Sequence, residues 1–249
     1  MKKQTISIFP LLIVGVFLVF ASSCEKDDDN SYSGNSTNGK TTAEFNSDIS
    51  YGTMTDQDGN VYKTVTIGTQ TWMAENLRTT KYNDGTAIPT VTDNDEWGDL
   101  TDGAFCNYND TANIDYIATY GRLYNWYTVN TGKLAPIGWH VPTDAEWTTL
   151  SDYLGGLSIT AGKLKEAGTT HWYSPNTGAT NETGFTALPG GSRSSNGTFG
   201  NIGNYGYWWS TTEYNATYSL HRSMSYNYNN VSGYSYKKVL GFSVRCVKD

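Results

Sequence analysis

The sequence predicts an α+β domain in which short helices pack on twisted antiparallel sheet, with long loops between them. A helix-capping pattern at residues 143–146 begins the clearest helix. After residue 185, short segments rich in aromatic and β-branched residues alternate with Gly- and Asn-rich turns, as strands do. The 249-residue chain also contains 19 Tyr, 8 Trp and 8 Phe, enough to fill a substantial core.

The first 23 residues are organised like a lipoprotein signal peptide. Lys2 and Lys3 precede an apolar stretch at residues 6–20, and small residues at 21–23 stand directly before Cys24. The apolar stretch is too short, and contains too many interrupting residues, for a typical membrane-spanning helix. We expect cleavage before Cys24 and acylation of that cysteine, as in palmitoylated lipoproteins. An uncleaved anchor or another cleavage position is the alternative.

Residues 24–50 predict an acidic tether. Residues 25–29 (EKDDD) resemble the acidic export signal that sends Bacteroidetes lipoproteins to the outer face of the outer membrane. A solvated acidic spacer is the alternative. Residues 30–48 are mostly Ser, Asn, Thr and Gly, which bury too little apolar surface to offset ordering entropy. The folded domain is therefore expected at residues 51–249.

Within this domain, the first expected unit is a hairpin, with strands at residues 61–67 and 71–74. Residues 80–118 are predicted to be mostly loop, and residues 121–129 a helix. A helix starting at Thr143 follows, and a second short helix is expected near residues 160–166. The later strand candidates are residues 185–188, 207–211, 218–226 and 242–247.

Six ordered motifs carry a family resemblance. They are residues 68–77 (GTQTWMAENL), 120–126 (YGRLYNW), 138–147 (GWHVPTDAEW), 184–191 (GFTALPGG), 206–213 (GYWWSTTE) and 241–249 (GFSVRCVKD). Together they resemble the Fibrobacter succinogenes major paralogous domain across residues 51–249, a family of surface proteins without an established activity. These motifs are in turn similar to those of the formylglycine-generating-enzyme group. The resemblance therefore implies a C-type-lectin-like fold.

Few residues suggest catalysis. The three histidines are scattered, no zinc, P-loop or nucleophile-elbow motif is present, and we predict no catalytic residue, metal or cofactor. Formylglycine formation in the distant relatives needs a close cysteine pair, and the domain contains only Cys106 and Cys246. These two are a possible disulfide in an oxidising compartment. Family members often have Cys where this chain has Ala135, which leaves any family pairing open.

Two other groups of residues are interpreted structurally. An acidic cluster around Trp97 offers oxygen ligands for calcium, but it fails the EF-hand spacing and is expected to be a solvated loop. It comprises Asp93, Asp95, Glu96, Asp99 and Asp102. The tryptophans inside the shared motifs are expected in the core rather than on a ligand platform. They are Trp72, Trp126, Trp139, Trp147, Trp208 and Trp209.

The segment at residues 205–236 has the composition of an antibody paratope. It contains eight of the 19 tyrosines with many Ser and Asn, no Lys, and Arg222 and Glu213 as its only formally charged residues. Tyr supplies rigid amphipathic area while Ser and Asn adapt their hydrogen bonds. The predicted ligand-binding residues are Tyr218, His221, Tyr226, Tyr228, Tyr234 and Tyr236. The alternative is that Tyr and Ser are simply good strand and turn residues.

These observations favour a cell-surface binding or adhesion module that recognises an extracellular glycan or protein. The chain has a formal net charge of -7 and no basic patch, so a nucleic-acid partner is not expected. A glycan-active enzyme and a structural surface-coat protein are the alternatives. A pair of carboxylates about 5 to 10 Å apart in a cleft would favour the enzyme.

Overall fold

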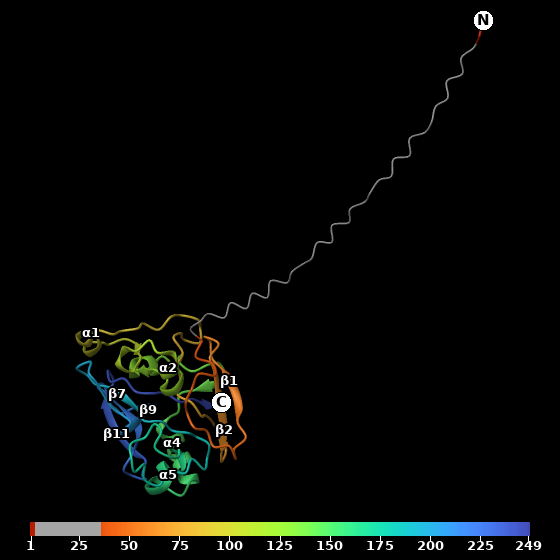
Figure 1. Cartoon of the computed structure of the whole chain (residues 1–249). Coiled ribbons are helices and arrows are strands. Elements are labelled where there is room, and N and C mark those ends of the chain that lie inside the picture. Colours follow the sequence, from red (N-terminus) through yellow and green to blue (C-terminus); the bar gives the residue numbers. More distant parts are fainter. Residues whose placement is uncertain (3–35) are drawn as a thin grey trace. The chain divides into compact units, whose positions relative to one another are not determined.

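The computed structural model describes residues 1–2 and 36–249, and the latter belong to one unit (Figure 1). The predicted signal peptide, Cys24 and the acidic run lie outside the described residues. The α+β class is confirmed, with two main sheets and a few short helices. Within the described ranges, no helix is both long and apolar enough to span a bilayer.

The first sheet joins the two ends of the domain. Its strand order is β1 (Gly52–Thr55), β2 (Val61–Ile67), β3 (Gln70–Met73), β12 (Val247–Lys248) and β6 (Trp139–His140). The predicted hairpin is confirmed as β2 and β3, which pair antiparallel. In β12, Val247 pairs with Trp72 and with His140, so the C-terminus lies beside the N-terminal hairpin.

The second sheet is built mostly from the C-terminal third of the chain. Its order is β11 (Ser232–Lys237), β10 (Tyr218–Ser225), β9 (Tyr205–Glu213), β7 (Gly190–Arg193) and β8 (Phe199–Ile202). The strands predicted at residues 207–211 and 218–226 are confirmed as β9 and β10, whereas β7, β8 and β11 were not predicted. The strand predicted at residues 185–188 is wrong, since only an isolated bridge at Ala187 forms there.

The helices of the described chain lie between β3 and β7. They are α1 (Asn94–Gly98), the 3-10 helix η1 (Tyr108–Asp110), α2 (Ile114–Tyr120), α3 (Trp126–Asn130), α4 (Asp144–Tyr153) and α5 (Leu157–Leu164), with β4 (Phe105–Cys106) and β5 (Leu123–Tyr124) forming a small hairpin. Residues 80–118 are thus more ordered than predicted. The helix predicted at residues 121–129 begins only at Trp126, because Asn125 caps it by accepting from the Thr128 amide at 3.1 Å.

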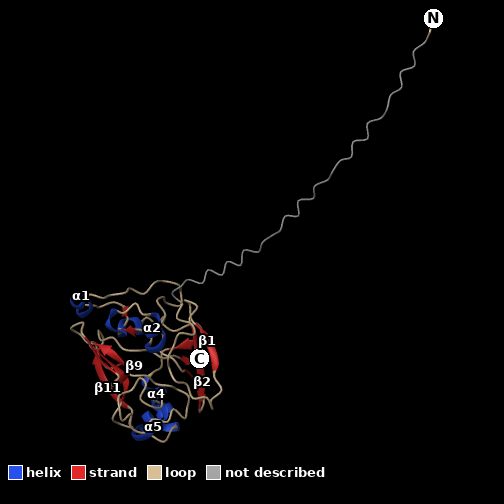
Figure 2. Cartoon of the chain, in the orientation of Figure 1, coloured by secondary structure: helices blue, strands red, loops and turns tan. Residues whose placement is uncertain are grey.

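The capping box that begins α4 is confirmed. The Thr143 hydroxyl accepts from the Glu146 amide at 3.2 Å, and the Glu146 carboxylate accepts from the Thr143 amide at 2.8 Å. Helices α4 and α5 pack together, and α4 also contacts β9 and β10 (Figure 2). This packing places Trp147 in the core, where its ring lies 4.7 Å from that of Trp72.

The predicted core tryptophans are also confirmed. All are fully buried except Trp139, which is partly buried against one of the core clusters. Trp208 and Trp209 are neighbours on β9 and point to opposite faces of the sheet, yet neither is exposed. The sheet is therefore covered on both faces at this point, with α4 and α5 on the Trp208 side.

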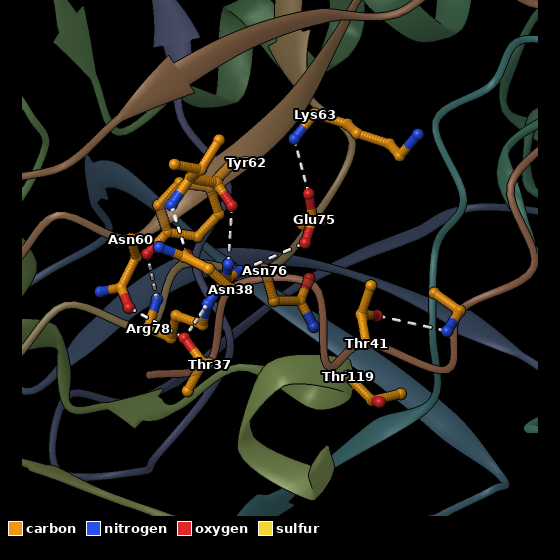
Figure 3. Close-up of polar contacts among 12 residues, drawn as sticks. Thr37, Asn38, Thr41, Asn60, Tyr62, Lys63, Glu75, Asn76, Arg78 and Thr119 are labelled. Atoms are coloured by element: carbon orange, nitrogen blue, oxygen red, sulfur yellow. Dashed lines mark hydrogen bonds and ion pairs between the residues drawn. The ribbon is translucent and has the colours of Figure 1, made fainter. Parts of the chain in front are cut away.

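The tether predicted to reach residue 50 is wrong for residues 36–50, which dock on the domain. The buried Thr37 hydroxyl accepts from Arg78 Nε at 2.8 Å (Figure 3). Further along, the Thr42 amide donates to Thr119 Oγ1 at 2.9 Å and the Glu44 amide to a Glu166 carboxylate oxygen at 2.6 Å. Phe45 and Ile49 of this segment also pack against the second core cluster. The polar composition misled because a few apolar contacts combine with hydrogen bonds to distant residues to hold this segment. We call residues 36–50 the N-terminal strap.

Candidate ligand-binding site

A pocket of about 420 Å³ opens on the β9–β10–β11 part of the second sheet. Its lining consists of Tyr205, Tyr207, His221, Ser223, Met224, Ser225, Tyr228, Asn230, Ser232, Tyr234 and Tyr236. No Asp, Glu, Lys or Arg belongs to this lining. We call it the tyrosine pocket. Its volume is in the range of small-molecule sites.

The strand register produces this lining. Side chains of paired residues point to the same face of a sheet, and successive residues alternate. His221 on β10 pairs with Tyr234 on β11, and Ser223 pairs with both Ser232 on β11 and Tyr207 on β9. On the central strand β10, Ser223 and Ser225 therefore lie beside the tyrosines of β9, and His221 lies beside Tyr234 of β11. The result is a hollow with aromatic walls and a floor of small polar side chains.

His221 lies beneath the surface of the pocket and is 0% exposed, so a ligand atom reaches its ring nitrogens only when the side chains that cover it move. Its ring centroid lies 4.8 Å from that of Tyr236, 5.2 Å from Phe242 and 5.9 Å from Tyr207. Neither ring nitrogen has a hydrogen-bond partner among the described residues. No other residue that lines the pocket has a buried side-chain polar atom left without a partner in the described structure. Such unfilled capacity is uncommon in protein interiors.

Burial decides the charge of His221. It lowers the pKa of the imidazole to about 4, although the nearby Tyr234 backbone favours the protonated form. The ring is therefore neutral near pH 7, with one nitrogen donating and one accepting. The neutral ring thus keeps a donor and an acceptor without a well-aligned partner among the described residues, with the Tyr234 backbone nearby, and both nitrogens are shielded from solvent.

Lys165 holds one wall of the pocket in place. Its buried ammonium donates to the carbonyl oxygens of Thr177, Ser225 and Tyr228, each at 3.0 Å. Ser225 and Tyr228 line the pocket, at the start of the turn that joins β10 to β11. Burial lowers the pKa of Lys165 to about 8. Lys165 was not predicted, because a lysine at a helix end gives no sign in the sequence that it is buried.

Comparison with known proteins supplies the family. The model of the Fibrobacter succinogenes major domain matches residues 65–248. The chain belongs to the Fibrobacter succinogenes major domain family. No curated protein and no solved structure shows significant similarity to it. The resemblance carried by the six motifs is thereby confirmed, while the nature of any ligand has to be argued from this chain.

The predicted site residues of this Fibrobacter succinogenes major domain are only partly brought together. Tyr228, Tyr234 and Tyr236 are exposed and line the pocket. Tyr218 and Tyr226 are half-buried and do not line it. Tyr226 packs instead against the second core cluster, on the helix side of the sheet.

The other pocket residues were missed by sequence reasoning. Tyr205 and Tyr207 line it with their rings stacked at 5.6 Å and an interplanar angle of 18°. The serines at 223, 225 and 232 and Asn230 complete the lining. Alternation along each predicted strand is the pattern that would have separated the pocket face from the helix face.

The predicted disulfide is absent from this domain. Cys106 and Cys246 are both buried free thiols. Cys106 packs with Trp97 and Leu123, whereas Cys246 belongs to the cluster around Trp126. Each thiol thus fills a separate apolar cluster. Burial raises the pKa of Cys106 to about 12 and that of Cys246 further, so both stay protonated.

The acidic cluster around Trp97 has a local structural role. The Asp93 carboxylate accepts from the Glu96 amide at 2.9 Å and so caps α1. Trp97 itself is fully buried, under the Arg193 guanidinium. In residues 36–249, no group of three or more His, Cys, Asp or Glu side chains is arranged to hold a metal ion.

Proposed function

We propose that this chain is a lipid-anchored cell-surface module that binds an extracellular glycan or protein in the tyrosine pocket. The observation that carries this proposal is an uncharged aromatic pocket that lies over the buried His221, whose ring nitrogens have no well-aligned partner among the described residues. A ligand group would complete these hydrogen bonds. Aromatic walls with adaptable small polar groups suit recognition.

Binding is favoured over the enzymatic alternative by the chemistry of the pocket lining. It contains no carboxylate pair for glycoside hydrolysis and no thiol. His221, with a pKa of about 4, is a poor general base near neutral pH. The side chains that line the cavity are therefore better suited to holding a ligand than to transferring protons.

We further propose that the fold is C-type-lectin-like. Two features support this. The N-terminal hairpin β2–β3 shares a sheet with the C-terminal strand β12, and the long stretch between them contributes the second sheet. In that fold, the part of the chain before the terminal strand lies beside the ligand-binding loops, and here it forms β9, β10 and β11.

The lipid anchor is a separate proposal, supported by the small residues before Cys24 and the acids after it. Replacing Cys24 with Ala is expected to release the protein from the membrane fraction. Protease shaving of intact cells tests surface exposure. The wild type should be cleaved, and a variant with Ala at positions 26–29 should be protected. Retention of Cys24→Ala in the membrane would contradict the anchor.

The binding proposal is tested with arrays of extracellular glycans and proteins probed with the full chain. Tyr234 and Tyr214 make a matched pair, because each is 64% exposed and only Tyr234 lines the pocket. Tyr234→Ala is expected to lose capture of the bound ligand, while Tyr214→Ala retains it. Equal capture by both variants, or no captured ligand at all, would contradict this use of the pocket.

A further inference from the structure

We propose that the ligand of the tyrosine pocket is a neutral carbohydrate, with a sugar ring packed on the tyrosine walls and a sugar hydroxyl that bonds to the buried His221 when the tyrosine rings over it move aside. This inference rests on the proposed binding function and names its ligand class. Three independent properties of the pocket support it: its lack of charge, the open bonds of His221, and the composition of its walls.

The pocket lining offers no counter-ion for an ionic ligand. The exposed Lys237 follows Tyr236 in β11 and therefore points to the opposite face of that strand. Arg222, next to His221 in β10, points to the opposite face, where its guanidinium lies 2.7 Å from an Asp144 carboxylate oxygen. Lys238 beyond the end of β11 is paired with Glu213 at 2.6 Å. A phosphate, sulfate or carboxylate in the pocket would lose water without gaining an opposite charge.

The open bonds of His221 select a hydroxyl. A neutral imidazole donates from one nitrogen and accepts at the other, and a hydroxyl group can complete either bond. A carboxylate can only accept, and an apolar group would leave the buried nitrogen unpartnered. A hydroxyl-rich ligand therefore suits whichever tautomer is present. It also suits the short polar side chains beside His221, which are Ser223, Ser225, Ser232 and Asn230.

The tyrosine walls provide the apolar part of the contact. Sugar rings have faces of C–H groups and edges of hydroxyls, and tyrosine combines a flat apolar ring with a polar tip. Tyr205 and Tyr207 on β9 form one stacked wall, and the exposed Tyr234 stands on β11, on the other side of β10. A cavity of about 420 Å³ admits a small ring compound. A protein partner would instead bury about 800 Å² of each surface in a standard interface.

The test uses the purified full chain in a detergent without a sugar head group. Titration calorimetry is run with neutral oligosaccharides of several sugar types and with uronic-acid oligosaccharides of matched length. The variants are His221→Phe, Tyr234→Ala and the control Tyr214→Ala. Phe preserves the aromatic contacts of His221 and removes its nitrogens. Tyr234→Ala alters an exposed side chain, and its folding is therefore not at risk if His221→Phe fails to fold.

A neutral oligosaccharide is expected to bind the wild type and Tyr214→Ala alike. Affinity should fall about tenfold in His221→Phe, as for one lost hydrogen bond, and at least as much in Tyr234→Ala. Acidic oligosaccharides should bind at least tenfold more weakly than neutral ones. Equal or tighter binding of the acidic sugars, or unchanged affinity in His221→Phe, would overturn the inference.

The failure of this inference can be separated from failure of the proposed function by probing the protein array with the same variants. A protein captured by the wild type and lost in Tyr234→Ala, with no neutral sugar bound, would overturn the carbohydrate ligand and leave the pocket as a binding site. Absence of any ligand whose capture depends on Tyr234 would overturn both.

Discussion

The two histidines His171 and His221 are both largely buried, but their surroundings are opposite. His171 Nδ1 lies 2.7 Å from a Glu166 carboxylate oxygen, and its Nε2 lies 3.0 Å from the Thr42 hydroxyl. His221 has no such partner in the described structure. The contrast separates two uses of a buried polar side chain. Both ring nitrogens of His171 lie within hydrogen-bonding distance of groups in the same chain. Those of His221 have no well-aligned partner among the described residues and lie beneath the tyrosine pocket.

The same contrast distinguishes the regions around them. Glu166 accepts from the Glu44 amide as well as pairing with His171, so the N-terminal strap is tied to the domain by satisfied hydrogen bonds. The side chain of the adjacent Lys165 points instead toward the tyrosine pocket, where it donates hydrogen bonds to carbonyls at the turn between β10 and β11. The neighbouring residues Lys165 and Glu166, directly after α5, thus anchor two different regions: Lys165 the tyrosine pocket and Glu166 the N-terminal strap.

The largest expected effect is a loss of stability at the contacts that hold the N-terminal strap. Glu166→Ala would leave His171 and the Glu44 amide without their acceptor, and each hydrogen bond lost to the carboxylate costs about 1.5 to 3 kcal/mol of unfolding free energy. Chemical denaturation measures this loss, and limited proteolysis should show cleavage within residues 36–50. The control Glu182→Ala removes an exposed carboxylate paired with Lys163 and should cost less than about 1 kcal/mol. Similar losses of unfolding free energy in both variants would show that the buried Glu166 contributes no more stability than an exposed carboxylate.

The next effect is a pH dependence specific to His221. Its pKa is about 4 in the folded chain against an ordinary 6.5, so between these values the unfolded chain binds a proton that the folded chain does not. Stability from this group is complete above pH 6.5 and falls by roughly 3 kcal/mol as pH drops to 4.

The rings of Tyr207, Tyr236 and Phe242 surround His221 and include no carboxylate or second histidine, while the Arg222 side chain points to the other face. Unfolding curves measured across that range should therefore be distinctly shallower in pH for His221→Phe than for the wild type. An identical slope in the two proteins would show that His221 is not held neutral.

A smaller effect is expected where Lys165 supports the pocket. Lys165→Met would leave three backbone carbonyls without their donor, at a cost of about 2 kcal/mol. Ligand affinity should fall as well, because the carbonyls of the pocket residues Ser225 and Tyr228 lose their hydrogen bonds to Lys165. Lys163→Met, two residues earlier in α5 and partly exposed, is the matched control and should change neither stability nor affinity. Unchanged affinity in Lys165→Met would show that the hydrogen bonds of Lys165 do not position the pocket residues.

Local patterns were predictable from the sequence, and contacts between distant segments were not. The capping box at Thr143 and the hairpin β2–β3 depend on neighbouring residues, and both were confirmed. The strap was misjudged because its partners, such as Arg78 and Glu166, are distant in sequence. The half of the pocket contributed by Tyr205 and Tyr207 was missed for a related reason. Only the register of β9 against β10 shows that these rings share a face with His221.

The most direct test of the account measures the stability and the ligand affinity of His221→Phe together. If the open nitrogens of His221 are kept for a ligand, replacing them with an apolar ring should leave the unfolding free energy unchanged or raise it by up to about 1 kcal/mol. Affinity for the neutral oligosaccharide should fall about tenfold. A loss of stability of more than about 2 kcal/mol with unchanged affinity would show that His221 is an ordinary core residue.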